Sequence, residues 1–173
     1  LHAVTKATYP AVMETVVPIL DDLKRRGITR FIGITERFNA DPAHEMLDLA
    51  LSDDIWDVIM VGFNILNQSA RDRVLPRAIE RNIGILAMFA VRLALSRPER
   101  LREVVAELAE RGEVAGVDLN DPLGFIDVPT VEAAYRFVRH EPGIHVTLTG
   151  TGSAEHMRSN LSSIQKPPLQ PDV

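Results

Sequence analysis

A turn of small residues near the C-terminus has the composition of an anion-binding site. The stretch VTLTGTGSAEH, residues 146–156, passes from β-branched and apolar residues into Gly150-Thr151-Gly152-Ser153 and then into a typical helix start. Backbone N–H groups at a helix N-terminus can face an anion, and the helix dipole favours negative charge there. The Thr151 and Ser153 hydroxyls can donate further hydrogen bonds. The alternative is structural: Ser153 caps the last helix and the glycines permit a tight turn.

The other residue types that commonly do chemistry give weaker signals. His2, a lone histidine at the start of the chain, indicates nothing by itself, and His44, His140 and His145 are expected at the surface or in packing. No spacing among histidine, aspartate and glutamate resembles a metal site, so no metal is expected. The chain has no cysteine, which excludes disulfides and thiolate chemistry.

Composition narrows the class of protein. The 173 residues are 46% hydrophobic and 25% charged, an ordinary globular balance. The net charge of −5 and the scattered Lys and Arg leave no basic face for nucleic acid. No apolar run approaches the roughly 20 residues of a membrane span, and the start has no secretory signal. We expect a cytoplasmic protein. Because the chain begins at Leu1 rather than Met, we interpret it as a piece of a longer protein.

Hydrophobic periodicity predicts alternating strands and helices. Four short apolar runs are typical of buried strands, at residues 30–35, 56–63, 83–89 and 144–150. Between and around them, helical patterns occupy residues 9–26, 39–51, 67–82, 96–112, 129–143 and 153–161. Pro18 should kink the first helix. The proline-rich tail, residues 165–173, is expected to be irregular.

Particular residues are expected to mark the helix ends. Gly27 and Gly112 lie where C-terminal caps belong. The expected N-caps are Asp41 (with Pro42 at the first helical position), Ser69, Thr130 and Ser153.

Strands separated by helices imply an α/β fold with parallel strands and right-handed crossovers. A four-stranded parallel sheet has two open edges, and a (β/α)8 TIM barrel closes them but typically takes about 250 residues. The chain therefore has the pattern of a partial TIM (β/α)8 barrel, roughly the second half, with parallel strands alternating with helices.

In order and spacing, the motifs resemble those of the aldo-keto reductase family. The matching segments are LH at the start, LKRRGITRFIGIT, WDVIMVGFNILN, NIGILAMFAV, and GTGSAEHMRSNL followed by PPL. The resemblance implies a single domain, residues 1–173, of an NADP(H)-dependent oxidoreductase whose N-terminal half is missing. The reaction implied is hydride transfer between nicotinamide and an aldehyde, ketone or sugar carbonyl or alcohol. The expected partner is thus a small-molecule substrate, not nucleic acid or a membrane; the oligomeric state stays open.

The resemblance also implies roles for individual residues. His2 corresponds to the family's catalytic histidine, which orients the carbonyl, whereas the Asp, Tyr and Lys of the tetrad would precede Leu1. The fragment alone is therefore expected to be inactive. The cofactor-binding positions are Thr35, Met88, Phe89, Arg92, Gly150, Thr151, Gly152, Ser153, His156 and Asn160.

Each of these positions has an implied cofactor contact. Around the final turn, Thr151, Gly152 and Ser153 would approach the 2′-phosphate, His156 would stand where Arg often lies, and Asn160 would reach the adenine. At the other end of the cofactor, Thr35 would donate to the carboxamide. Met88 or Phe89 would cover the nicotinamide, and Arg92 would meet the pyrophosphate.

The sequence departs from the family pattern at three positions. Gly150 replaces a lysine of some members, so NAD(H) is an alternative cofactor. Glu36 and Met60 replace the Asn and Gln that hold the carboxamide. The departures leave open a non-catalytic or regulatory NADP-binding module of the same fold, and an unrelated reaction on a similar barrel. A truncated, poorly folding product is the remaining alternative, since open strand edges promote aggregation.

Overall fold

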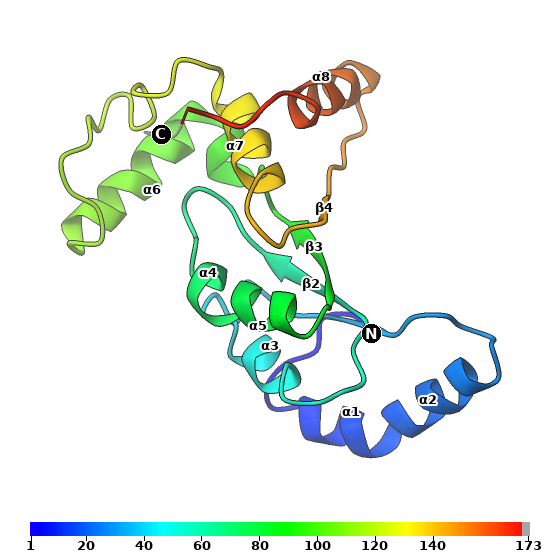
Figure 1. Cartoon of the computed structure of the whole chain (residues 1–173). Coiled ribbons are helices and arrows are strands. Elements are labelled where there is room, and N and C mark those ends of the chain that lie inside the picture. Colours follow the sequence, from blue (N-terminus) through cyan, green and yellow to red (C-terminus); the bar gives the residue numbers. More distant parts are fainter. Residues whose placement is uncertain (171–173) are drawn as a thin grey trace.

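The computed structural model describes residues 1–170, so the last three residues of the proline-rich tail lie outside the described part. Four parallel strands form one sheet in the order in which they occur in the chain, and Figure 1 labels the last three of them. They are β1 (Gly33–Thr35), β2 (Val58–Gly62), β3 (Gly84–Met88) and β4 (Val146–Thr147). Helices connect successive strands, which confirms the predicted parallel arrangement of a partial barrel.

The strands are shorter than predicted, most of all the last one. Of residues 144–150 only Val146 and Thr147 form β4. Pairing with β3 nevertheless extends to either side, because His145 donates its backbone N–H to the Ile85 carbonyl and Leu148 donates to Ala87.

Helices occupy the predicted regions, but two of them are divided. In the described residues they are α1 (Tyr9–Thr15), α2 (Val17–Arg25), α3 (Glu45–Ala50), α4 (Ala70–Arg73), α5 (Leu75–Glu80), the 3-10 helix η1 (Leu93–Ser96), α6 (Pro98–Glu110), α7 (Thr130–Arg139) and α8 (Ala154–Ile164). The breaks at Val16 and Val74 each fall two residues before a proline, Pro18 and Pro76. A proline has no N–H for a helical bond, so it is accommodated in a first turn.

The sheet buries one face and leaves the other largely uncovered. Ile59, Val61 and Ile85 point to the buried face and have no exposed surface. They belong to a core cluster with residues of α3, α5 and α7. A second cluster is formed by residues of α6 together with other residues of α7. On the opposite face Met60 is only half-buried and Val146 is 46% exposed. This uncovered face is the one that points inward in a closed barrel.

The predicted helix ends are correct for two glycines and for Ser153. Ser69 holds the predicted N-cap position of α4 without making the capping hydrogen bond, and the predicted N-cap positions of Thr130 and Asp41 are wrong. Gly27 and Gly112 have φ of +71° and +72°, as C-terminal caps require. Thr130 is the first residue of α7 rather than its cap. Ser69 precedes α4, but its hydroxyl donates to the Pro42 carbonyl at 2.8 Å instead of capping the helix.

Asp41 caps α3 from a greater distance than predicted. The helix begins at Glu45, after His44 with φ +60°. The Asp41 carboxylate accepts hydrogen bonds from the Glu45 and Met46 amides at 2.9 and 2.8 Å. Pro42 therefore lies in the loop, not in the helix.

None of the helices in residues 1–170 is long and apolar enough to cross a membrane.

We expect the Tyr9→Phe substitution to weaken the attachment of α1 to the segment between α3 and β2. Tyr9 is 3% exposed, donates to Asp53 Oδ2 at 2.7 Å and accepts from Trp56 Nε1 at 3.0 Å. Phenylalanine would leave the buried indole N–H unpaired, which costs about 1–3 kcal/mol. Urea unfolding of both proteins measures the loss. An unchanged free energy of unfolding would show that the indole N–H finds another partner.

Candidate functional site

The loops that follow the four strands carry most of the predicted site residues. In a parallel sheet the carboxyl ends of all strands meet at one edge, and ligands bind outside that edge in barrels and open sheets alike. The loops concerned are residues 36–44, 63–69, 89–97 and 148–153. The site is described below from the last loop backwards.

The turn after β4 keeps several backbone N–H groups unpaired. Ser153 caps α8, because its Oγ accepts from the His156 amide at 3.3 Å. The Thr151 Oγ1 accepts from the Ser153 amide at 3.2 Å. Within residues 1–170, the amides of Thr151, Gly152, Ala154 and Glu155 donate to no protein acceptor. The turn can therefore offer these groups to a ligand or to solvent.

Nothing inside the structure explains the two glycines of this turn. Neither Gly150 nor Gly152 has a positive φ. A Cβ added at either position would meet no atom within 4 Å. Both residues are exposed. The tight turn therefore does not require glycine, and the glycines leave the approach to the backbone open.

The base of this turn is anchored by side chains of two helices. Thr149 Oγ1 lies 2.7 Å from the Tyr135 hydroxyl of α7 and accepts from Asn160 Nδ2 of α8 at 2.9 Å. Asn160, which we expected to reach an adenine, is 8% exposed and is bound to Thr149 in this structure. His156 is exposed on the first turn of α8.

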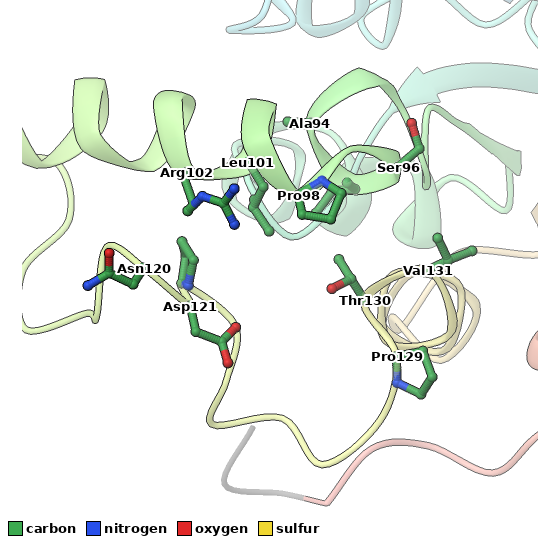
Figure 2. Close-up of a pocket in the computed structure, with 12 residues that line it drawn as sticks. Ala94, Ser96, Pro98, Leu101, Arg102, Asn120, Asp121, Pro129, Thr130 and Val131 are labelled. Carbon is green, nitrogen blue, oxygen red and sulfur yellow. The ribbon is translucent and has the colours of Figure 1, made fainter.

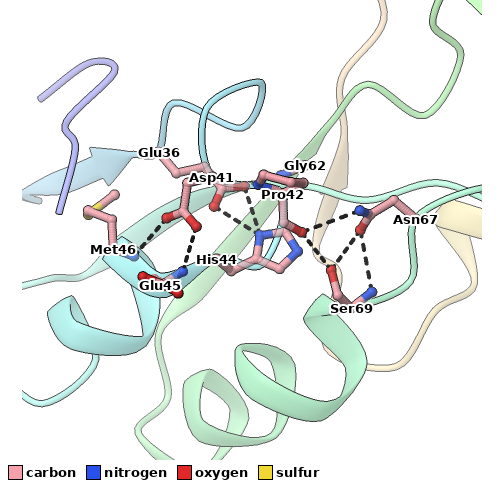
Figure 3. A network of polar contacts seen from close by, with 9 residues as sticks. All are labelled: Glu36, Asp41, Pro42, His44, Glu45, Met46, Gly62, Asn67 and Ser69. Carbon is pink, nitrogen blue, oxygen red and sulfur yellow. Dashed lines mark hydrogen bonds and ion pairs between the residues drawn. The ribbon is translucent and has the colours of Figure 1, made fainter.

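A buried acid–base pair lies at the carboxyl end of β1 (Figure 3). The side chains of Glu36 and His44 are both fully buried. His44 Nδ1 lies 2.9 and 3.1 Å from the two carboxylate oxygens, and the Gly62 amide at the end of β2 donates to Oε1 at 2.7 Å. The pair thus joins the ends of β1 and β2 to the start of α3. His44 is a packing residue, one of the two expected possibilities.

The surroundings of Glu36 favour the protonated form of its carboxyl group. Burial raises the pKa of Glu36, while the hydrogen bond from His44 and the Gly62 amide oppose the rise. His44 Nε2 is buried and has no hydrogen-bond partner within residues 1–170. Sequence patterns could not reveal this pair, because neither residue type indicates burial.

The beginning of the chain runs beside β1. Thr35 donates its amide to the Leu1 carbonyl at 3.0 Å, and Val4 donates to the Thr35 carbonyl at 3.0 Å. His2 is exposed within this segment, and Thr35 is 8% exposed at the end of β1. His2 therefore lies in the segment that runs alongside β1, close to Thr35 at the end of that strand.

The loop after β3 forms a cluster of aromatic and basic side chains. Met88, 9% exposed, ends β3 beside Gly62. Phe89 follows with φ +68°, and the Arg92 guanidinium lies 4.1 Å from its ring centroid. Arg92 also donates to Asn39 Oδ1 at 2.7 Å, which ties this loop to the loop after β1.

Sequence reasoning missed one member of this cluster, Phe38. Its ring centroid lies 5.7 Å from that of Phe89. Phe38, Asn39 and Arg92 line a hollow of about 440 Å³ past the carboxyl ends of the strands. Gly62 was the available signal, since a glycine at a strand end often marks the close approach of another group.

A separate hollow of about 350 Å³ lies between the starts of α6 and α7 (Figure 2). Arg102, Asp121 and Thr130 are among its lining residues. None of the predicted site residues lines it. In residues 1–170, no three or more His, Asp or Glu side chains are arranged to hold a metal ion.

Comparisons with known proteins agree on one family. A family model described as the aldo/keto reductase family matches residues 1–173. The structure is similar to an aldo-keto reductase from Bacillus halodurans in its holo form, with a TM-score of 0.68 and 16% sequence identity. The apo form of that protein gives a TM-score of 0.69 at the same identity. The alignments cover 99% of this chain but 56% and 57% of the other. No curated protein matches.

The raised pKa of Glu36 gives a testable pH dependence. Because the folded state holds this proton more tightly than the unfolded state, the contribution of Glu36 to stability is full below about pH 4.3 and is lost as pH rises through the raised value. We expect Glu36→Gln to remove this dependence. Urea unfolding of both proteins between about pH 4 and 7 should show the wild type losing stability relative to the variant. A constant difference would contradict the assignment.

Two threonines of the last strand region provide a matched pair. Thr149→Val removes the hydroxyl that is hydrogen-bonded to both Tyr135 and Asn160 and should destabilise the protein by about 1–3 kcal/mol. Thr147→Val should be neutral or stabilising, because the Thr147 hydroxyl is buried without a partner in the described residues. Thermal and urea unfolding of the two variants measure the difference. Equal effects would show that the Tyr135–Thr149–Asn160 contacts do not anchor the turn.

Proposed function

Because the chain belongs to the aldo-keto reductase family, we propose that it is part of an NADP(H)-dependent oxidoreductase. The reaction proposed is hydride transfer between nicotinamide C4 and the carbonyl carbon of a small aldehyde, ketone or sugar. The chain spans a little over half of the Bacillus halodurans reductase, 56% of its length. We accordingly assign the activity to a complete protein of which this chain supplies the carboxyl-terminal half.

The observation that carries the proposal is the turn Gly150–Ser153. The turn contains two exposed glycines and leads into an eleven-residue helix. Among the described residues, the turn and the first residues of this helix together present four unpaired amides. A phosphate group is the ligand best suited to such an arrangement, because it accepts several N–H bonds and gains from the helix dipole. The residues present therefore fit a phosphate monoester such as the 2′-phosphate of NADP(H).

The hydroxyls of the turn can add to this binding. Thr151 Oγ1 and Ser153 Oγ already accept hydrogen bonds from backbone amides, which fixes their positions. Their own protons remain free to point at a phosphate oxygen. His156, exposed one turn into α8, would add a positive charge when protonated.

Other predicted residues would contact the substrate carbonyl and the pyrophosphate of the cofactor. The bound nicotinamide supplies the hydride. His2, at the sheet edge beside Thr35, would donate a hydrogen bond to the carbonyl oxygen and orient it. Arg92, in the loop after β3, would neutralise the pyrophosphate. By the family pattern, the group that delivers the proton lies in the part of the protein that would precede Leu1.

One observation favours a second candidate, a regulatory NADP-binding module. The carboxylate of Glu36 is bound to His44 and to the Gly62 amide, and Met60 offers no hydrogen bond. Two of the three polar contacts that the family pattern gives the carboxamide are thus lost. Single-turnover oxidation of bound NADPH by an aldehyde, with the complete protein, separates the candidates. Binding without loss of NADPH would favour the module.

Ser153→Asp tests the phosphate-binding turn directly. Aspartate is as good a helix N-cap as serine, so α8 should keep its start, while the added charge repels a phosphate. We expect NADPH affinity to fall about tenfold or more, equivalent to about 1.4 kcal/mol. NADH, which lacks the 2′-phosphate, should lose less.

The control is Ser162→Asp, the same change at an exposed position farther along α8. Fluorescence titration of the complete proteins with NADPH and NADH provides the affinities. Unchanged NADPH affinity in Ser153→Asp would refute the cofactor assignment of this turn.

A further inference from the structure

The Phe38 ring lies directly against the backbone of Gly62, where any other residue would place its Cβ. A Cβ added to Gly62 would lie 2.3 Å from Cδ2 of the Phe38 ring. Such contacts do not occur, so the ring and the glycine fit each other. Because Gly62 pairs with Met88 in the register of β2 and β3, the Phe38 ring lies at the ends of these strands.

Two rings, one from the same loop and one from the loop after β3, hold the Phe38 ring in place. The ring centroid lies 5.8 Å from that of His44 and 5.7 Å from that of Phe89. His44 is itself bound to Glu36, and Glu36 accepts from the Gly62 amide. The buried acid–base pair thus fixes both Gly62 and the imidazole against which Phe38 packs. An aromatic ring held from several sides is a rigid surface.

The Phe38 ring is nonetheless accessible to a ligand. Phe38 is half-buried and lines the hollow of about 440 Å³. This size is within the usual range for ligand sites, about 300–1,000 Å³. Arg92 lines the same hollow and forms no ion pair with a carboxylate in the described residues. The Phe38 ring offers a flat apolar surface and Arg92 offers a positive charge in the same hollow. This combination suits a ligand in which a planar ring is linked to a phosphate group.

The residues expected to cover the nicotinamide are arranged differently from the prediction. Phe89, at φ +68°, contacts both the Phe38 ring and the Arg92 guanidinium and does not line the hollow. Met88 is 9% exposed and does not line the hollow. Phe38 is therefore the aromatic residue of this cluster that presents surface to the hollow.

We propose that Phe38, seated on Gly62, is a nicotinamide-binding residue whose ring packs against the nicotinamide of the bound cofactor. The inference rests on the proposed function and names a contact that the family pattern does not supply. Offset stacking of two planar rings contributes beyond their buried area, so an aliphatic side chain of similar size cannot replace Phe38 fully.

The test compares two ligands that differ only in the nicotinamide. In the complete protein, Phe38→Leu should weaken NADPH binding roughly threefold to tenfold. Binding of 2′-phospho-ADP-ribose, which has no nicotinamide, should stay within about twofold of wild type. Isothermal titration calorimetry measures both, and Phe38→Tyr, which keeps the ring, should restore NADPH affinity.

Glycine variants provide an independent measurement. Gly62→Ala should mimic Phe38→Leu, because its Cβ displaces the ring. Gly84→Ala is the matched control, since its nearest contact beyond adjacent residues would be an ordinary 3.4 Å. Loss of both ligands in Phe38→Leu, or of neither, would overturn the inference. Failure of the unchanged protein to bind either ligand would instead refute the proposed function.

Discussion

Parallel pairing of the strands is the constraint on which the site depends. Because β1 to β4 all run in one direction, the four loops that follow them lie at one edge of the sheet. The turn at Gly150–Ser153, the pair Glu36–His44 and the cluster around Phe89 come from different parts of the chain. They share an edge only because of this topology. Reversing one strand would carry its loop to the opposite end of the sheet.

The site combines a rigid base with an open surface. Buried polar contacts fix the backbone on the helix side: Thr149 is held by Tyr135 and Asn160, and Glu36 by His44 and Gly62. At the rim of the site, the turn Gly150–Ser153 exposes two glycines, and it and the start of α8 carry amides that are unpaired among the described residues. A rigid base with exposed donors is expected of a binding site, because donors that are already fixed lose little conformational entropy when the ligand binds.

Much of the fold could be predicted from the sequence, because short apolar runs and helical periodicity are local signals. Gly27, Gly112 and Ser153 mark helix ends as predicted, since each acts on its own neighbours. The errors involve contacts between distant segments. Asp41 caps α3 from across a loop because His44 adopts a left-handed backbone, and Ser69 binds the Pro42 carbonyl of another loop. Residue type alone does not predict such contacts.

The candidate site was predictable to a different degree in each loop. The turn after β4 could be proposed as a site because glycine, hydroxyl and helix-start residues are adjacent in the chain. The position of Phe38 could not be predicted, because it depends on the missing side chain at Gly62, 24 positions away in sequence. For Glu36, the sequence predicted the loss of a carboxamide contact, because the family pattern has an asparagine there. It did not predict that the Glu36 carboxylate is bound to His44 and to the Gly62 amide.

The most direct test of the account is amide hydrogen exchange in the complete protein, with and without NADPH. If the unpaired amides of the last loop bind the cofactor phosphate, exchange at residues 151–155 should slow on addition of NADPH, and more than with NADH. Protection confined to other regions, with unchanged exchange in this turn, would contradict the account.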